Sequence, residues 1–354
     1  MKRKSRYITL FSLLTMCAVA LTGCGESKPT LKFYNWGEYA SYEVISNFEK
    51  EYNCKVICDY YDSNETMYNK IQSGDSYDVM IPSDYMIERL ISEDRLMELD
   101  KSQLPNLEKL TEGVKGLDFD QDNTYSAPYF WGSVGILYNP EAVSAETVES
   151  QGWDVLKNTD YKGRIYMYDS ERDSFMIALK ALGYSMNTEN EAEIEEAYQW
   201  LKELNDTMEP VYVTDEVIDN MISGNKDMAV VYSGDGTFIS SENENLKYYE
   251  PEQGTNIWRD AMVISKDCEN PELAHQFINY MLDNEAAKAN SEFVGYTTSN
   301  DEVMKEISSE GGLFSGNPAY SVRQGYEKDE VFHDNEVIRK LLSDYWIKVK
   351  ASEQ

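Results

Sequence analysis

The sequence of 354 residues has few basic residues and almost no histidine. It contains 32 Lys and Arg against 64 Asp and Glu, and only 2 His, so its formal net charge is −32. A nucleic-acid partner needs clustered Lys and Arg to meet the phosphate backbone, and no such cluster occurs after residue 6. Two histidines also disfavour a His-based zinc site and a Ser-His-Asp triad. A field this negative repels anions and attracts cations.

The motifs of several enzyme classes are missing as well. No glycine-rich phosphate loop follows a predicted strand, and no Gly-x-Ser-x-Gly nucleophile elbow occurs. After the N-terminus, no apolar tract is long enough to span a bilayer. We therefore expect no cofactor and no metal.

Cysteine is scarce, with 5 residues and no disulfide framework. Cys54 and Cys58 flank an extended apolar stretch, and four residues of strand span about 13 Å, too far for a disulfide between them. We favour small buried side chains at these positions over a bridge that involves Cys268.

The N-terminus has the layout of a secretory signal peptide. Basic residues 2–6 precede an apolar run at 7–21, and the run ends in Leu21-Thr22-Gly23-Cys24, which resembles a lipobox. We expect residues 1–23 to be removed, Cys24 to be lipidated, and residues 24–30 to form a short tether. Removal takes away four basic residues and no acid, which changes the formal charge from −32 to −36. The mature protein is then expected outside the cytoplasmic membrane, attached by lipid. An ordinary signal peptide that happens to end at a cysteine is the alternative.

Apolar spacing predicts that strands and helices alternate along the chain. The predicted strands are 31–35, 55–61, 78–81, 164–168, 228–232 and 261–264. The predicted helices lie at 44–52, 63–74, 83–91, 174–182, 191–204, 270–282 and 334–350. The βαβαβ order at the start predicts a parallel sheet with helices on its faces. Two α/β lobes fit the pattern better than one sheet, and ligands of such folds bind at the carboxyl ends of strands.

Five segments beside predicted strands each pair an aromatic residue with a carboxylate. They are 36–39, 82–85, 168–173, 232–235 and 258–260. Carboxylates can neutralise the ammonium groups of a linear polycation, and aromatic faces can cover its methylenes and add about 0.5–2 kcal/mol each. With 27 Tyr and 64 acids, some of these pairings arise by chance. The argument for a binding site therefore depends on the occurrence of five such pairings at strand ends, and not on any one of them.

From about Leu31 to the last helix, the sequence resembles the spermidine/putrescine-binding lipoproteins that supply ABC importers. The segments that carry the resemblance are Phe33-Tyr34-Asn35-Trp36-Gly37-Glu38-Tyr39, Asp62-Ser63-Asn64-Glu65-Thr66-Met67-Tyr68, Tyr77-Asp78-Val79-Met80-Ile81-Pro82-Ser83, Ile257-Trp258-Arg259-Asp260 and Gly295-Tyr296-Thr297-Thr298. The resemblance implies a periplasmic-binding-protein-like fold, in which each lobe is a mixed sheet flanked by helices and crossing strands form the hinge. Lobe 1 would comprise 31–137 and 260–305, and lobe 2 would comprise 138–259 and 306–354.

The resemblance also implies the roles of individual residues. In lobe 1, Trp36 and Tyr39 would flank one end of a polyamine, and Glu38 would pair with its terminal ammonium. Ser83 and Tyr85 would line the wall of the same lobe.

Three further residues would surround the middle of the ligand. Trp258 would stack on the methylenes, Asp260 would meet an interior or nearby nitrogen, and Tyr296 would close the side.

The far end of the ligand would be held by Asp169, Ser170 and Asp173. The family has an acid at the position aligned with Ser170 and a Glu where Asp173 stands, so Asp169 is expected to substitute. Tyr232 replaces a frequent Trp, and His333 falls where a Gln reaches the ligand in spermidine binders. The choice between spermidine and putrescine stays open.

The function that the resemblance implies is extracytoplasmic capture of a polyamine by a monomer, closure of the two lobes, and delivery to an ABC permease, without covalent chemistry or a cofactor. One alternative is an extracellular carbohydrate-acting enzyme, because two carboxylates across a cleft and aromatic platforms also suit glycoside hydrolysis. A second alternative keeps the fold and changes the ligand to another small solute, such as another small cation.

Overall fold

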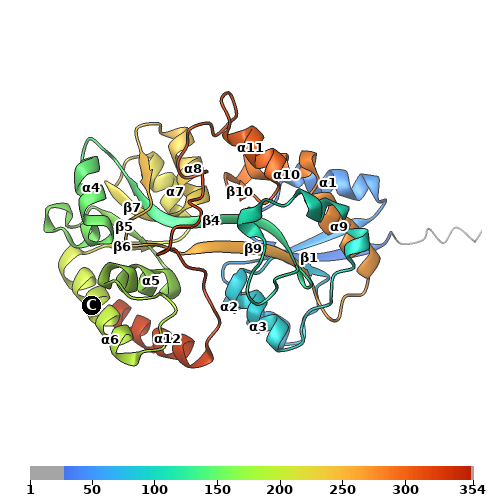
Figure 1. Cartoon of the computed structure of the whole chain (residues 1–354), viewed down its shortest axis with the longest axis horizontal. Helices are drawn as coiled ribbons and strands as arrows, with labels where there is room; N and C mark the ends of the chain where they lie inside the picture. The colour runs from blue at the N-terminus through green and yellow to red at the C-terminus, as the bar shows by residue number, and fades with distance from the viewer. Residues whose placement is uncertain (1–27, 352–354) are drawn as a thin grey trace, which may run out of the picture.

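The computed structural model describes residues 28–351, and Figure 1 shows its two halves side by side. The predicted signal peptide and Cys24 lie outside the described residues. The strands are β1 (Thr30–Trp36), β2 (Lys55–Tyr61), β3 (Val79–Met80), β4 (Ser126–Tyr138), β5 (Ile165–Tyr168), β6 (Val211–Val213), β7 (Met228–Tyr232), β8 (Lys247–Tyr249), β9 (Ile257–Ile264) and β10 (Thr297–Thr298). The helices are α1 (Tyr42–Glu51), α2 (Asn64–Gln72), α3 (Asp84–Ser92), α4 (Ala145–Gln151), α5 (Glu171–Leu182), α6 (Glu191–Met208), α7 (Glu216–Ile222), α8 (Ser233–Glu242), α9 (Pro271–Met281), α10 (Asn284–Val294), α11 (Asp301–Ser308) and α12 (Glu336–Ala351).

The strands follow the order β2-β1-β3-β9-β4-β7-β5-β6, and β8 and β10 also pair with β4. β1 pairs in parallel with both β2 and β3, so the parallel βαβαβ unit predicted from the sequence is confirmed. β9 runs antiparallel to β3 and β4, and β5 is parallel to β6 and β7. The result is a mixed sheet with helices on its faces.

Strand β4 joins two groups of strands. Its first part, 126–133, pairs with β9, and from Val134 onward it pairs with β7 and β8. Figure 1 shows β4 and β9 running between the two groups. We call the half that contains β1–β3 lobe 1 and the half that contains β5–β7 lobe 2. The residue boundaries given above for these lobes stay a prediction.

Three of the differences from the sequence prediction concern elements that lie near the predicted site residues. The thirteen residues of β4 are all buried, so they show no alternation of apolar and polar residues, and the strand was not predicted. β9 begins at Ile257, so Trp258 and Asp260 lie within a strand and not in the loop before it. Residues after Tyr232 form α8 instead of a loop.

Helices α1 and α9 cover the β1 face through a cluster of aromatic residues. Phe277 is fully buried, and its ring centroid lies 4.9 Å from that of Phe33 and 5.0 Å from that of Phe48. Cys54, Cys58 and Cys268 are free, which agrees with the preference against a bridge, but only Cys54 is buried and the other two are half-buried. Among the described residues, no helix combines the length and apolar character needed to cross a bilayer.

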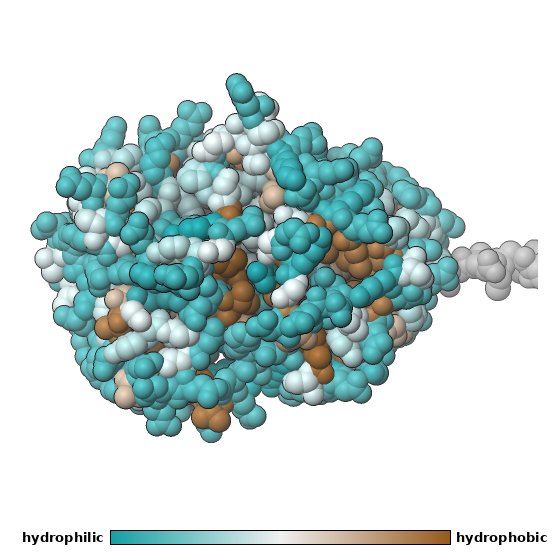
Figure 2. Space-filling view, viewed as in Figure 1, coloured by the Kyte–Doolittle hydropathy of each residue, from teal (hydrophilic) through white to brown (hydrophobic). Residues whose placement is uncertain are grey.

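Figure 2 shows a mostly hydrophilic face, with hydrophobic side chains visible near the middle, between the two lobes. A chain with 64 acids and 32 bases covers itself mainly with charged groups.

Phe277→Ala should lower the free energy of unfolding by about 3–5 kcal/mol, because it removes a fully buried ring and leaves a cavity between two other rings. Urea unfolding would measure the change. Phe293→Ala is the control, since Phe293 is 40% exposed. A loss below about 1 kcal/mol for Phe277→Ala would contradict this description of the core.

Candidate ligand-binding site

Six aromatic side chains form a continuous row that draws on both lobes. In order along the row they are Trp36, Tyr39, Tyr296, Trp258, Tyr232 and Tyr168. The centroids of neighbouring rings are 4.7–6.5 Å apart. We call this set the aromatic row.

Strand ends place three members of the aromatic row. Trp36, Tyr168 and Tyr232 are the last residues of β1, β5 and β7, and the carboxyl ends of strands are the usual ligand-binding edge of α/β sheets. Hydrogen bonds fix two of the rings, because Trp36 Nε1 donates to the Ile81 carbonyl at 2.8 Å and Trp258 Nε1 donates to the Ser133 carbonyl at 3.1 Å.

Two glycines make room for the aromatic row. A Cβ atom at Gly132, in β4, would lie 2.4 Å from the Trp258 ring. A Cβ atom at Gly234, in the first turn of α8, would lie 1.3 Å from the Tyr296 ring. Only glycine therefore lets these two rings rest directly on the backbone.

Asp260 is a buried carboxylate beside Tyr39 of the aromatic row, and it is 6% exposed. Its Oδ2 accepts a hydrogen bond from the Tyr39 hydroxyl at 2.7 Å. Its Oδ1 is buried and has no hydrogen-bond partner among the described residues. Burial raises the pKa of Asp260 to about 6, because a charge in a poorly solvated place is disfavoured, and the side chains of Tyr39 and Ser83 oppose part of this rise.

Asp173 is the corresponding carboxylate in lobe 2, and it is 4% exposed. Its Oδ2 accepts hydrogen bonds from the Tyr232 hydroxyl at 2.7 Å and from Ser170 Oγ at 2.8 Å. Its Oδ1 is also buried and has no partner among residues 28–351. Burial raises its pKa, and the side chains of Tyr232, Ser170 and Asn256 oppose part of this rise.

Two more carboxyl groups lie close to the row, and the sequence prediction of site residues missed both. Asp235, in the first turn of α8, accepts a hydrogen bond from the Tyr296 hydroxyl at 2.9 Å, and burial raises its pKa to about 7. The pairing of an aromatic residue and an acid in segment 232–235 was a signal for it. Asp84 is fully buried with a pKa raised to about 7 by burial, and its oxygens accept from the backbone N–H groups of Tyr85 and Arg259. Asp84 therefore fixes α3 against β9.

Ser83 and Tyr85 lie next to this group. Asn64 Nδ2 donates to Ser83 Oγ at 3.0 Å and to the Tyr85 hydroxyl at 3.1 Å. Ser83 also forms a backbone bridge with Asp260. A hydrogen-bonded network thus connects these two predicted wall residues to the buried carboxylate.

The structure does not bring three of the predicted residues into the aromatic row. Glu38 is exposed beside Tyr39. Asp169 is exposed and forms an ion pair with Lys350 at 3.2 Å. His333 is exposed, and its Nδ1 lies 3.3 Å from a carboxylate oxygen of Glu88.

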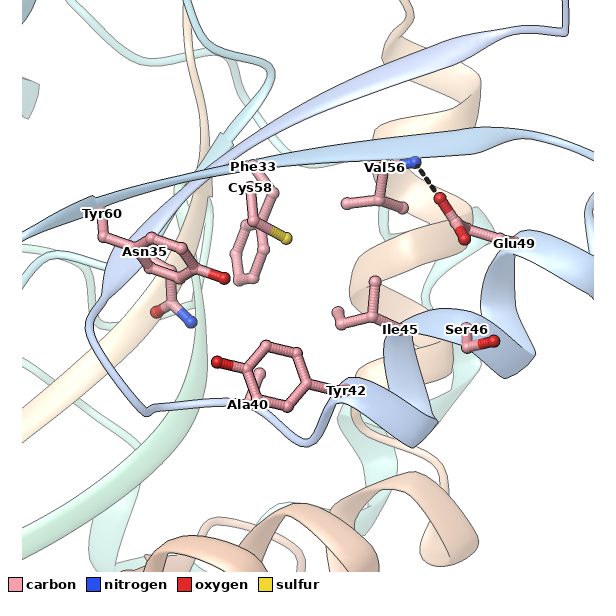
Figure 3. A pocket seen from close by; sticks show the side chains of 10 residues that line it. All are labelled: Phe33, Asn35, Ala40, Tyr42, Ile45, Ser46, Glu49, Val56, Cys58 and Tyr60. Carbon is pink, nitrogen blue, oxygen red and sulfur yellow. Dashed lines mark hydrogen bonds between the residues drawn. The ribbon is translucent and has the colours of Figure 1, made fainter.

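A cavity of about 190 Å³ lies elsewhere in lobe 1, between β1, β2 and α1 (Figure 3). Its lining residues are Phe33, Asn35, Ala40, Tyr42, Ile45, Ser46, Glu49, Val56, Cys58 and Tyr60. The only carboxylate in this lining, Glu49, accepts a hydrogen bond from the Val56 backbone N–H at 2.9 Å. None of the predicted site residues lines this cavity, so it is not our candidate for the main ligand site.

The chemistry of the aromatic row suits a ligand with positively charged donors. A buried carboxylate oxygen without a donor is costly, and such acceptors are almost always paired in proteins. Asp173 and Asp260 each offer one such oxygen, and the rings beside them offer faces that attract cations. Among residues 28–351, no group of three or more His, Cys, Asp or Glu side chains is arranged to hold a metal ion.

The family model described as "Bacterial extracellular solute-binding protein" matches residues 43–314. The spermidine/putrescine-binding periplasmic protein of Salmonella typhimurium is 32% identical over 353 residues, which cover 99% of each chain.

Two solved structures are also similar. One is a putative spermidine/putrescine ABC transporter from Listeria monocytogenes, with a TM-score of 0.82, 36% identity, and coverage of 91% of this chain and 98% of that one. The other is a spermidine/putrescine ABC transporter substrate-binding protein from Streptococcus pneumoniae, with a TM-score of 0.78, 33% identity, and coverage of 92% and 100%. These likenesses confirm the predicted fold class.

Asp235→Asn should reduce the dependence of stability on pH in the ligand-free protein. The pKa of Asp235 rises from 3.8 to about 7 on folding, so the folded state binds more protons than the unfolded state between these values. The free energy of unfolding therefore falls as the pH rises through this window.

Urea unfolding at pH 5 and pH 8 would measure this effect, and the loss of stability between them should shrink by about 1–3 kcal/mol in the variant. Asp94→Asn is the control, because the Asp94 side chain is 83% exposed. An identical loss in Asp235→Asn and the unmodified protein would contradict the raised pKa.

Proposed function

The chain belongs to the family of bacterial extracellular solute-binding proteins, and from this premise we propose that it captures a linear polyamine and delivers it to an ABC importer. One observation carries the proposal. Two buried carboxylates, Asp173 and Asp260, each have one oxygen held by a tyrosine and one oxygen without a donor. The aromatic row connects them.

Each end of the ligand would find a specific partner. An ammonium group would donate to Asp260 Oδ1 and another to Asp173 Oδ1, and a hydrogen bond to a charged group contributes about 1.5–3 kcal/mol. Tyr39 and Tyr232 would keep the two carboxylates in the orientation that exposes these oxygens to the ligand. The cation would also favour the ionised carboxylate and so lower the pKa of Asp260 again.

The methylenes of the ligand would lie between the two carboxylates. In the aromatic row, Tyr296 and Trp258 come between Tyr39, which holds Asp260, and Tyr232, which holds Asp173. Flat rings at these places can cover an aliphatic chain and attract the charges at its ends, at about 0.5–2 kcal/mol for each ring.

The two carboxylates come from different parts of the fold, which supports closure of the lobes around the ligand. Asp173 belongs to α5 of lobe 2, and Asp260 belongs to β9, which runs between the lobes. We place the hinge where β4 and β9 pass between lobes, near the boundaries predicted at 138 and 260, with a third crossing near 305. Closure would bury the cation and exclude water.

We place the mature protein outside the cytoplasmic membrane, attached to it through lipidated Cys24. We expect it to be a monomer and to have an ABC permease as its partner. The signal-peptide pattern in residues 1–23 and the printed names of the relatives support this. The relatives also disfavour the carbohydrate-acting enzyme and the other small solutes as alternatives. In this proposal the protein carries out no covalent chemistry and needs no cofactor.

Asp260→Asn should weaken the binding of putrescine and spermidine at least about tenfold, because the amide removes the negative charge that faces the ammonium. Isothermal titration calorimetry would give the affinities, and circular dichroism would check that the variant is folded.

Asp120→Asn is a matched control. Asp120 is also a buried carboxylate, 4% exposed, but its oxygens accept from the backbone N–H and hydroxyl of Ser126 outside the aromatic row. This variant should lose stability and keep its affinity. A folded Asp260→Asn variant with unchanged affinity would remove the central assignment.

A further inference from the structure

The cavity between β1, β2 and α1 lies in lobe 1 (Figure 3), and no residue of the aromatic row lines it. In the parallel register of β1 and β2, Phe33 pairs with Cys58 and Asn35 pairs with Tyr60. Alternate residues of a strand point to the same face of a sheet. These four side chains therefore form one wall of the cavity, and residues of α1 form the opposite wall.

The cavity has the size of a small ring-shaped molecule and is reached from solvent. An apolar cavity of about 150 Å³ in another protein binds benzene, so a volume of about 190 Å³ leaves room for one small ring system. Tyr42 and Tyr60 both line the cavity and are 66% and 46% exposed. A ligand can therefore enter beside these two rings. The exposed Phe293 ring, whose centroid lies 6.3 Å from that of Tyr42, extends the apolar rim.

Most of the lining is apolar or neutral. Phe33, Ile45 and Val56 supply apolar surface. Burial raises the pKa of the Cys58 thiol, against an opposing effect of the Tyr60 hydroxyl, and burial raises the pKa of Tyr60 to about 12. The thiol and the phenol therefore stay protonated and uncharged near neutral pH.

One polar side chain in the lining lacks a partner. Asn35 is 1% exposed, and its Oδ1 is buried and has no hydrogen-bond partner within the described part of the chain. Figure 3 shows the Asn35 amide at the end of the cavity where Tyr42 and Tyr60 lie. A buried acceptor without a donor is costly, and such groups are almost always paired in proteins. A ligand that brings a donor would meet this need.

Glu49, the carboxylate in the lining, limits the charge of the ligand. One of its oxygens already accepts the Val56 backbone N–H at 2.9 Å, and the residue is half-buried. An ammonium group at a carboxylate that water still reaches gains little energy. An anion would be repelled by Glu49 and by a chain whose formal net charge is −32. The lining therefore favours a neutral ligand.

We propose that this cavity is a second binding site, for a small, neutral, planar molecule that carries one N–H or O–H donor. The donor pairs with Asn35 Oδ1, and the flat body of the molecule lies between α1 and the face of β1 and β2. The inference goes beyond the capture of a polyamine and does not depend on it, because the cavity shares no residue with the aromatic row or with Asp173 and Asp260.

Indole and benzofuran are matched probes, because they have nearly the same shape and only indole has an N–H donor. Saturation-transfer difference NMR with the unmodified protein would measure both affinities. Indole should bind at least about threefold more tightly, because only indole gains a hydrogen bond to Asn35. Equal affinities for the two probes, or no detectable binding of indole at millimolar concentration, overturns the inference and leaves the proposed function intact.

Substitutions of Cys58 test whether indole occupies this cavity. Cys58→Phe should weaken indole binding at least about tenfold, because the added ring fills the space that the ligand needs. Cys58→Ala is the matched control and should keep the affinity, because it leaves the space open. Unchanged affinity in a folded Cys58→Phe variant would place indole elsewhere, such as against the aromatic row, and would overturn the inference.

Asn35→Leu tests the donor contact, because leucine has a similar size and no acceptor. The variant should bind indole and benzofuran equally, and circular dichroism would check that it is folded. A general distortion of the cavity would instead lower both affinities by the same factor and keep the preference for indole. A folded Asn35→Leu variant that keeps this preference overturns the inference.

Discussion

A buried carboxylate needs a donor for each of its oxygens, because the water that it gives up on burial has to be replaced. Asp173 and Asp260 are both buried, and a tyrosine hydroxyl satisfies one oxygen of each. The second oxygen of each has no donor within the described part of the chain. In the proposed function, an ammonium group would supply both the missing donor and a neutralising charge, so this single interaction would account for the acids, the rings and the class of ligand together.

The burial of these carboxyl groups also connects ligand binding with the stability of the protein, because burial raises their pKa values. Burial raises the pKa of Asp235 and Asp260 to about 7 and about 6, so these two carboxyl groups keep protons at pH values where exposed carboxyl groups have lost theirs. In the proposed complex, a bound cation would replace those protons. Strands β4 and β9 bring the groups together, since β4 pairs with strands of both lobes and β9 carries Trp258 and Asp260. The site is therefore placed where movement between lobes can enclose a ligand.

The sequence predicted the elements whose burial alternates or whose ends are capped. β1 and β2 were placed within a residue or two, and the side chain of Ser63 accepts the N–H of Thr66 at the start of α2. β4 was missed because both of its faces are buried, which removes the period of two.

Some residues that lie close in sequence to the site motifs lie outside the aromatic row in the structure. Asp169 contacts Lys350 and His333 contacts Glu88 at the surface, and such long-range contacts leave no local pattern in the sequence. Asp235 was in a noted segment, but its bond to Tyr296 joins residues 61 positions apart.

The most direct test of the account is a crystal structure of the mature protein with putrescine bound. One nitrogen of the diamine should lie within about 3 Å of Asp260 Oδ1 and the other within about 3 Å of Asp173 Oδ1, with the methylenes against Trp258 and Tyr296. A diamine bound in the cavity between β1, β2 and α1, or bound with both of these oxygens still without a donor, would contradict it.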